Sequence, residues 1–347
     1  MTTTHASIRK DPSATGWRFL GRIGIALLWT ALALMTLWAL AALYIDFRIE
    51  ALRIPITLLY AVAVITVFFK FKGRRWLPVL YLVGFCCVLA WWFTLKPTND
   101  ANWEADSAKS AWAEFHGDRV TIHNFRNCDY RSERDYSNCW GDRTVDLSKI
   151  RGVDLFLDNW GIKFASHPMV SFQFGDNEHI VFSIEARYKV GQTYSTILGC
   201  FRQFGLMVVA ADERDVIRLR TNYRKDENVY LYRVNVGPEI ARKMFLTYVT
   251  SMNDVKDHPA WYNEVTRNCT TTLQKPLASD VNNPQPWNYQ YLLNGTLDRL
   301  LYERGRFVTG GLTFPELKQQ ALINPAAHAA GLSPDFSSLV RKGRIGF

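Results

Sequence analysis

The most constraining feature of the sequence is a long run of uncharged, mostly apolar residues near its beginning. Residues 23–45 contain no charged side chain. A helix rises about 1.5 Å per residue and the hydrocarbon core of a bilayer is about 30 Å thick, so a run of this length is enough to cross it. The run therefore predicts a membrane-spanning helix. It is too long for the apolar part of a cleaved signal peptide, and further apolar segments follow it.

Two such segments lie shortly downstream. Residues 76–95 are uncharged and contain one proline, Pro78, near the start, where a helix tolerates it. Residues 54–69 are also uncharged but number only 16, so this span requires Arg53 and Lys70 to extend their charged ends toward water. The sequence predicts a three-span membrane anchor over residues 23–95, preceded by a flank at residues 1–22.

The basic residues of the short loops predict the orientation of the anchor. Four Lys or Arg residues precede the first span, two separate it from the second, and four separate the second from the third. Because cytoplasmic loops carry an excess of Lys and Arg, the first flank and the second loop should be cytoplasmic. Everything after Lys96 should then lie on the periplasmic side of a bacterial inner membrane. Topology thus explains much of the net charge of +9, and nucleic acid is not an expected partner.

The rest of the chain has the pattern of an α+β domain, with strands in the middle and helices after them. Residues 96–118 are polar and rich in turn-forming residues, which predicts a connector before a domain at residues 119–347. The expected strands cover residues 119–125, 153–157, 169–174, 179–184, 216–219 and 229–234. The expected helices cover residues 239–252 and 287–303, the second ending at Gly305.

Four of the six cysteines lie outside the spans, where the predicted compartment is oxidising. Cys128 and Cys139 are eleven positions apart in a turn-rich segment, a spacing that suits a local disulfide. Cys200 and Cys269 then need separate explanations.

Cys269 is the candidate nucleophile, because it lies immediately before a predicted helix. Unpaired backbone amides and the helix dipole favour a thiolate at a helix N-terminus. The same amides can bind an oxyanion, and we expect the flanking Asn268 and Thr270 to help position the reacting group. The alternative is that Cys269 is a small buried core residue.

The candidate base and its orienting group lie upstream. His167 stands at the beginning of one predicted strand, and Glu185 lies on the next. If these strands pair antiparallel, Glu185 lies near the imidazole and fixes its tautomer. The alternatives are a loop histidine and a solvated glutamate. Arg187 and Arg202 are candidates for binding a phosphate or carboxylate, with structural ion pairs as the alternative, and the sequence predicts no metal or cofactor.

Six short motifs, taken in order, resemble the Lnb N-terminal periplasmic domain family. They are residues 167–172, 182–187, 201–204, 212–217, 219–222 and 268–271, and a looser resemblance continues at residues 294–295, 301–302 and 335–337. The resemblance extends over about residues 119–341. Members of this family are similar to circularly permuted papain-like (NlpC-like) enzymes, in which the histidine strand precedes the cysteine helix. The resemblance implies Cys269 as nucleophile, His167 as base and Glu185 as the third member.

Some Lnb-type proteins are lipoprotein N-acyltransferases, which move an acyl chain from phospholipid to the amino group of a lipoprotein's lipidated N-terminal cysteine. The resemblance therefore implies a cysteine-dependent acyltransferase at the outer face of the inner membrane, with a thioester intermediate and with phospholipid and lipoproteins as partners. In those proteins the membrane region follows the periplasmic domain, whereas here three predicted spans precede it. Two alternatives stay open: a papain-like hydrolase that cuts a peptide or a peptidoglycan amide, and a non-catalytic membrane-tethered module.

Overall fold

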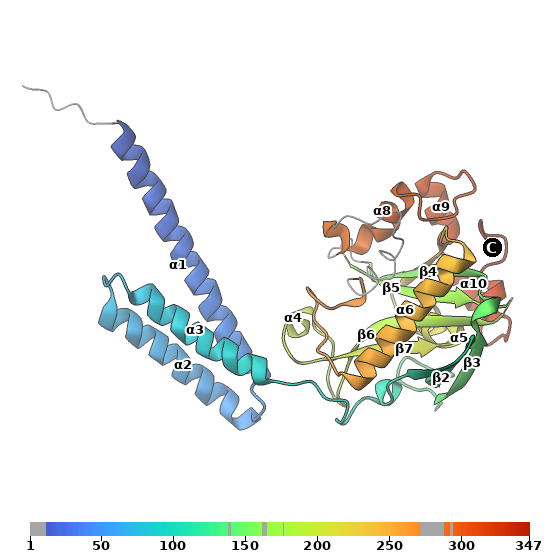
Figure 1. Ribbon diagram of the computed structural model, residues 1–347, viewed down its shortest axis with the longest axis horizontal. Helices are drawn as coiled ribbons and strands as arrows, with labels where there is room; N and C mark the ends of the chain where they lie inside the picture. The colour runs from blue at the N-terminus through green and yellow to red at the C-terminus, as the bar shows by residue number, and fades with distance from the viewer. Residues whose placement is uncertain (1–11, 138–139, 162–164, 176, 271–287, 292–293) are drawn as a thin grey trace, which may run out of the picture. The chain divides into compact units, whose positions relative to one another are not determined.

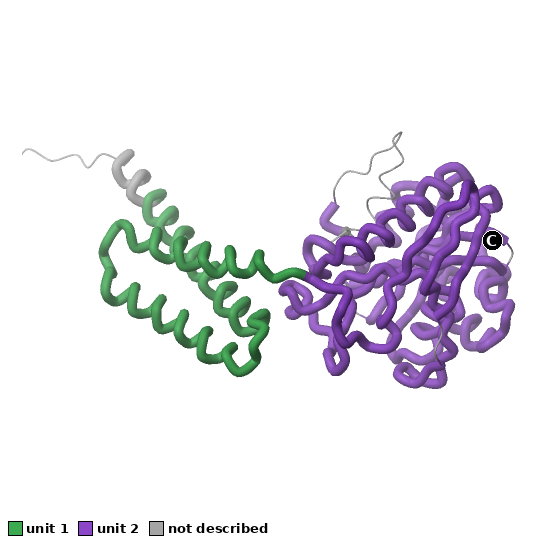
Figure 2. Tube along the Cα trace, turned by 60° about the horizontal axis from the view of Figure 1, so that its bottom comes forward, with its two compact units in different colours: residues 1–96 green, residues 97–347 purple. Residues whose placement is uncertain are grey.

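A computed structural model describes residues 12–347 except 138–139, 162–164, 176, 271–287 and 292–293. The chain divides into two compact units, Met1–Lys96 and Pro97–Phe347 (Figure 2).

The first unit consists of three apolar helices: α1 (Pro12–Asp46), α2 (Glu50–Phe71) and α3 (Leu77–Thr94). The stretches long and apolar enough to cross a membrane are Leu20–Asp46, Glu50–Phe71 and Leu77–Thr94. Large apolar side chains such as Leu59 and Phe69 are exposed on these helices, as expected of surfaces that face lipid. The helix α2 has 22 residues, so the chain continues helical beyond both ends of the short uncharged run. Each predicted span is therefore present as a helix.

The three helices pack through aromatic side chains. The rings of Trp38 and Trp92 meet edge to face with centroids 5.3 Å apart, which joins α1 to α3. The Trp92 indole donates a hydrogen bond to Asp46 Oδ2 at 2.6 Å. This bond gives the carboxylate at the C-terminus of α1 a polar partner.

The second unit is built on one eight-stranded sheet (Figure 1). The strand order is β1-β2-β7-β6-β5-β4-β8, and β3 also pairs with β2. The pairing of β2 with β7 is parallel and the other pairings are antiparallel. The strands are β1 (Trp112–His116), β2 (Arg119–Arg126), β3 (Trp140–Asp146), β4 (Gly152–Asn159), β5 (Ser166–Gln173), β6 (His179–Arg187), β7 (Gly205–Ala211) and β8 (Asn228–Arg233).

Both faces of the central strands are covered, because alternate side chains of a strand point to opposite faces. Val170 and Phe182 belong to a core that includes α6 (Pro238–Asp257), which crosses what we call the first face. Met169 and Val181 belong to a core that includes α5 (Glu213–Arg218), α10 (Asn324–Ala330) and α11 (Phe336–Leu339), on what we call the second face. The remaining α-helices described are α4 (Thr196–Gly199), α8 (Leu297–Glu303) and α9 (Phe314–Ala321).

The predicted α+β class, with three apolar helices before a sheet domain, is confirmed. Strands lie at five of the six predicted segments, and α6 covers the helix predicted at residues 239–252. The predicted strand at residues 216–219 is wrong. Asp212 caps α5 by accepting a hydrogen bond from the Arg214 amide, and the helix buries Val216 and Ile217 on the second face.

Three strands were missed, and one helix is shorter than predicted. Strand β1 lies inside the predicted connector, where it pairs with β2 as Ala113↔Ile122. Strands β3 and β7 were not expected. In the region where the sequence predicted a helix at residues 287–303, α8 begins only at Leu297, and Trp287 lies outside the described residues.

Candidate active site

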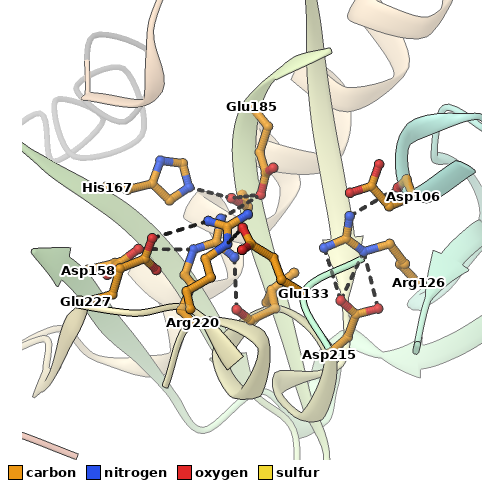
Figure 3. Close-up of polar contacts among 12 residues, drawn as sticks. Asp106, Arg126, Glu133, Asp158, His167, Glu185, Asp215, Arg220 and Glu227 are labelled. Atoms are coloured by element: carbon orange, nitrogen blue, oxygen red, sulfur yellow. Dashed lines mark hydrogen bonds and ion pairs between the residues drawn. The ribbon is translucent and has the colours of Figure 1, made fainter. Parts of the chain in front are cut away.

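A chain of hydrogen bonds holds His167 near the start of β5. His167 is buried, and its Nε2 lies 2.7 Å from Ser183 Oγ. The Ser183 hydroxyl donates to Glu185 Oε1 at 2.7 Å. Because the Ser183 hydroxyl donates its only proton to Glu185, it can only accept a hydrogen bond from His167. The ring proton of His167 is therefore on Nε2. Nδ1 is then the unprotonated nitrogen. Among the described residues it has no hydrogen-bond partner, and Figure 3 shows it pointing away from Arg220.

The strand register explains this arrangement. β5 and β6 pair antiparallel with Met169 opposite Ser183, so the period of two brings His167 and Glu185 to the same face at neighbouring positions. The predicted approach of Glu185 to the imidazole therefore occurs through a bridging hydroxyl. Sequence reasoning missed Ser183, although its position two residues before Glu185 on one strand was the available signal.

A buried ionic network surrounds Glu185 (Figure 3). Arg220, on the π-helical turn Leu219–Tyr223, donates to Glu185 Oε1 at 3.0 Å and lies 3.3 Å from Asp158 Oδ2. Burial alone would raise the pKa of Glu185, but the charges of Arg220 and Arg126, with the hydrogen bond from Ser183, together more than offset this and hold that pKa well below its usual value. Burial, followed by the charge of Arg220, lowers the pKa of His167 to about 3. Glu185 is therefore ionised at neutral pH, and His167 is neutral.

One aromatic ring, Trp160, lies over the imidazole, and a second ring, Tyr194, packs against Trp160. Trp160 lies nearly parallel to His167, with centroids 6.5 Å apart and an interplanar angle of 13°, and its indole donates to Asp158 Oδ2 at 3.1 Å. Tyr194 meets Trp160 edge to face at 6.3 Å. The orientation of the ring is thus restrained by Ser183 on its edge and by Trp160 on its plane.

Cys269 lies at the beginning of a helix, as predicted: Cys269 and Thr270 are helical, and residues 271–287 lie outside the described residues. The thiol is buried in the first-face core, which also contains Tyr248 and Tyr262, and its Sγ is 3.8 Å from Thr270 Oγ1. Burial raises the pKa of Cys269 to about 12, more than the hydrogen bonds from Thr270 lower it. The thiol is therefore neutral in this conformation, and not the thiolate expected at a helix N-terminus.

Asn294 connects the start of β5 to the start of the Cys269 helix. Its Oδ1 accepts a hydrogen bond from the Ser166 amide at 2.6 Å, and its Nδ2 donates to Thr270 Oγ1 at 2.5 Å. One side-chain amide therefore binds the sequence neighbours of both His167 and Cys269. Sequence reasoning gave Asn294 no role beyond its place in a loose motif at residues 294–295.

The candidate base and the candidate nucleophile belong to opposite faces of the sheet. Because alternate residues of a strand point to opposite faces, the ring of His167 lies on the second face together with Met169. Cys269 packs in the core of the first face. Among the described residues no hydrogen bond joins Cys269 Sγ to the His167 imidazole. Asn268 caps the helix, because its Oδ1 accepts from the Thr270 amide at 3.0 Å and its Nδ2 donates to Glu264 O at 2.5 Å. Asn268 and Thr270 thus position the Cys269 backbone.

Arg187 is engaged with the segment that follows the anchor, residues 97–111, here called the tether segment. It is buried, and its guanidinium lies 4.4 Å over the Trp103 ring. Burial lowers its pKa to about 10. These contacts agree with the structural alternative for Arg187. Its donors bind Ser107 O at 2.7 Å, Ala108 O at 2.8 Å, Asn99 Oδ1 at 3.1 Å and Ser110 Oγ at 3.1 Å.

Two other expectations concern residues away from this centre. Arg202 lies half-buried between α4 and β7. Cys128 is disulfide-bonded, whereas Cys139 lies outside the described residues, so the pairing of these two stays a prediction. Within the described part of the chain, no group of three or more His, Cys, Asp or Glu side chains is arranged to hold a metal ion.

Residues 136–295 match the family model of the Lnb N-terminal periplasmic domain. The match includes His167, Glu185 and Cys269, and it confirms the resemblance for this part of the chain. Together with the three apolar helices, it indicates a membrane-anchored protein with a periplasmic domain. No curated protein matches the chain, and no solved structure matches it. The circular permutation relative to papain stays a prediction.

Proposed function

We propose that this protein is a membrane-anchored acyltransferase in which Cys269 is the nucleophile and His167 Nδ1 is the base. The observation that carries the proposal is the chain from His167 through Ser183 to Glu185, which fixes one tautomer and leaves Nδ1 able to accept a proton. A carboxylate that orients a histidine through a hydrogen bond is the usual support for a cysteine or serine nucleophile. The Asn294 bridge brings the strand of this histidine and the helix of Cys269 together.

The proposed reaction has two halves, and His167 transfers a proton in each. Cys269 Sγ attacks the carbonyl carbon of a phospholipid acyl ester while Nδ1 takes the thiol proton. The ester C–O bond breaks, and the leaving alkoxide takes that proton from the imidazolium. An amine then attacks the thioester, loses a proton to Nδ1 and forms an amide. The C–S bond breaks, and the thiol recovers its proton.

The first proton transfer requires Sγ and Nδ1 to approach each other. In the conformation described here the thiol is neutral and packed between apolar side chains. Catalytic hydrogen bonds in ligand-free enzymes often form fully only when substrate binds. The proposal therefore includes a rearrangement at the start of the Cys269 helix when the acyl substrate binds.

A substrate in the bilayer is favoured by the short connection between the two units. Lys96 ends the first unit, and Arg187 binds the tether segment from Asn99 onward. The second unit is thus held within a few residues of the last apolar helix, which ends at Thr94. We place this unit on the periplasmic side of the inner membrane, on the distribution of Lys and Arg between the loops.

The test is acyl transfer by the full-length protein in lipid nanodiscs. Phosphatidylethanolamine with isotopically labelled acyl chains is the donor, and a synthetic lipopeptide with a diacylated N-terminal cysteine is the acceptor. Mass spectrometry of the lipopeptide should detect a labelled N-acyl group. Cys269→Ala and His167→Ala should each lower the rate by roughly 1000-fold or more, and the double variant should be no slower, because the two groups act as one unit.

The matched control is Cys200→Ala, which removes the other free thiol described in this unit and should leave transfer unchanged. Cleavage of peptides or peptidoglycan that depends on Cys269, without acyl transfer, would replace the proposal by the hydrolase. Transfer that survives Cys269→Ala would refute the assigned nucleophile.

A further inference from the structure

The second unit carries a cluster of exposed apolar side chains close to the tether segment. Ile197 on α4 is 70 % exposed, and Val190, Val265 and Tyr194 are also exposed. We call these four residues the apolar patch. Large exposed apolar side chains that gather at one place mark a surface that another apolar surface covers.

The patch is built from two segments that are fixed to each other. The Glu264 amide donates to Gly199 O at 3.1 Å, and the Tyr194 hydroxyl donates to the Glu264 carboxylate. Ile197 and Val265 are therefore held on neighbouring turns. Hydrogen bonds inside the unit fix this arrangement, so the patch exists without a partner.

The patch is bound to the tether segment. The Val190 amide donates to Asn102 O at 2.9 Å, and the Glu104 amide donates to Tyr188 O at 3.0 Å. Five residues separate Lys96, the last residue of the anchor unit, from Asn102. A fully extended chain over these six steps spans about 20 Å, so Asn102 and the Val190 bound to it stay within about that distance of Lys96.

We infer that the apolar patch docks on the surface of the bilayer that holds α1, α2 and α3. The short connection keeps the patch near this surface, and its side chains are those that partition into the interface. The exposed Lys189 directly precedes Val190, the exposed Arg267 lies two positions after Val265, and both suit lipid phosphates.

Docking in this way would bring lipid close to the candidate base. Tyr194 of the patch contacts Trp160, and Trp160 stacks on His167. Only one aromatic ring separates the docked surface from the imidazole. The inference does not depend on the chemistry of Cys269, because it rests on exposure and on the tether.

Photo-crosslinking of the full-length protein tests the inference. The residue p-benzoylphenylalanine replaces Ile197, or separately Val265, in protein held in nanodiscs of phosphatidylethanolamine and phosphatidylglycerol. After irradiation, mass spectrometry of the peptides should find phospholipid adducts at both positions. Leu332, which is 62 % exposed on the same unit and follows α10, is the control and should give at least about tenfold less adduct.

A second variant tests the patch as a unit. Ile197→Asp should lower the adduct yield at position 265 several-fold without changing the melting temperature, because Ile197 is exposed. Cys269→Ala should leave every adduct yield unchanged, which separates this inference from the proposed function. Equal yields at positions 197, 265 and 332 would overturn it, and so would adducts to a second copy of the chain in place of lipid.

Discussion

Ser183→Ala tests the hydrogen-bond chain that orients the candidate base. Ser183 is fully buried and bridges His167 Nε2 and Glu185 Oε1, each at 2.7 Å. Removing the hydroxyl leaves the Nε2 proton buried without an acceptor, which costs about 1–3 kcal/mol of folding free energy. Glu185 keeps its ion pair with Arg220, so the fold should survive. The imidazole is then free to exchange tautomers, and acyl-enzyme formation should slow by roughly 10- to 1000-fold.

The sheet offers a matched control for this variant. Ser171 is also fully buried on the second face, and its hydroxyl donates to Glu213 Oε1 at 2.6 Å. Ser171→Ala removes the same kind of bond, and Glu213 keeps its ion pair with Arg341. Thermal unfolding should show a loss of stability in both variants, while stopped-time mass spectrometry should show slow acylation only in Ser183→Ala. Equal acylation rates in the two variants would refute the role assigned to Ser183.

Three further predictions concern the fold and its charges. A reporter active only in the periplasm, fused after Phe347, should be active, since the basic residues place the N-terminus in the cytoplasm; a stable but silent fusion would reverse the topology. Non-reducing peptide mapping should find Cys128 linked to Cys139, a small loop worth roughly 2–3 kcal/mol, and another partner for Cys128 would contradict the pairing. Burial lowers the pKa of His167 to about 3 from its ordinary 6.5, so the unfolded state binds a proton that the folded state rejects. As pH falls from 6.5 to about 4.5, the wild type should lose up to about 1.4 kcal/mol per pH unit relative to His167→Gln, and parallel stability curves would contradict this.

The sequence predicted the elements whose pattern is strong and local. The three apolar helices follow from uncharged runs, and strands β4, β5 and β6 follow from short β-rich segments. The strand predicted at residues 216–219 was wrong because a buried helix turn and a short strand have the same apolar composition. Strand β1 was missed because it is short and buries only Ala113 of its five residues, with the polar Glu114 and His116 exposed, as at many sheet edges.

The candidate site was predictable in its parts but not in its assembly. The sequence predicted the helix start at Cys269 and the strand position of His167. The pairing of β5 with β6 then places Glu185 on the same face as His167. The bridging roles of Ser183 and Asn294 depend on contacts between distant segments, which no local pattern encodes. The partners of Arg187 and Arg220 could not be predicted from the sequence for the same reason. Only the fold brings Arg187 to the tether segment and Arg220 to Glu185.

Two aromatic residues of the second unit show how burial decides whether a ring can reach lipid. Trp160 and Tyr262 are of the residue types that suit a membrane interface. In the structure Tyr262 is buried beside Cys269, and Trp160 packs on His167. The exposed side chains next to the tether segment are instead those of the apolar patch.

The intact mass of the full-length protein after incubation with phospholipid nanodiscs, without an acceptor, tests the central claim most directly. If Cys269 forms an acyl-enzyme, the wild type should gain the mass of one fatty acyl chain, and hydroxylamine should remove it as expected of a thioester. The Cys269→Ala variant should gain nothing. An unchanged mass in the wild type under conditions that support turnover, or an adduct that persists in Cys269→Ala, would contradict a thioester at this residue.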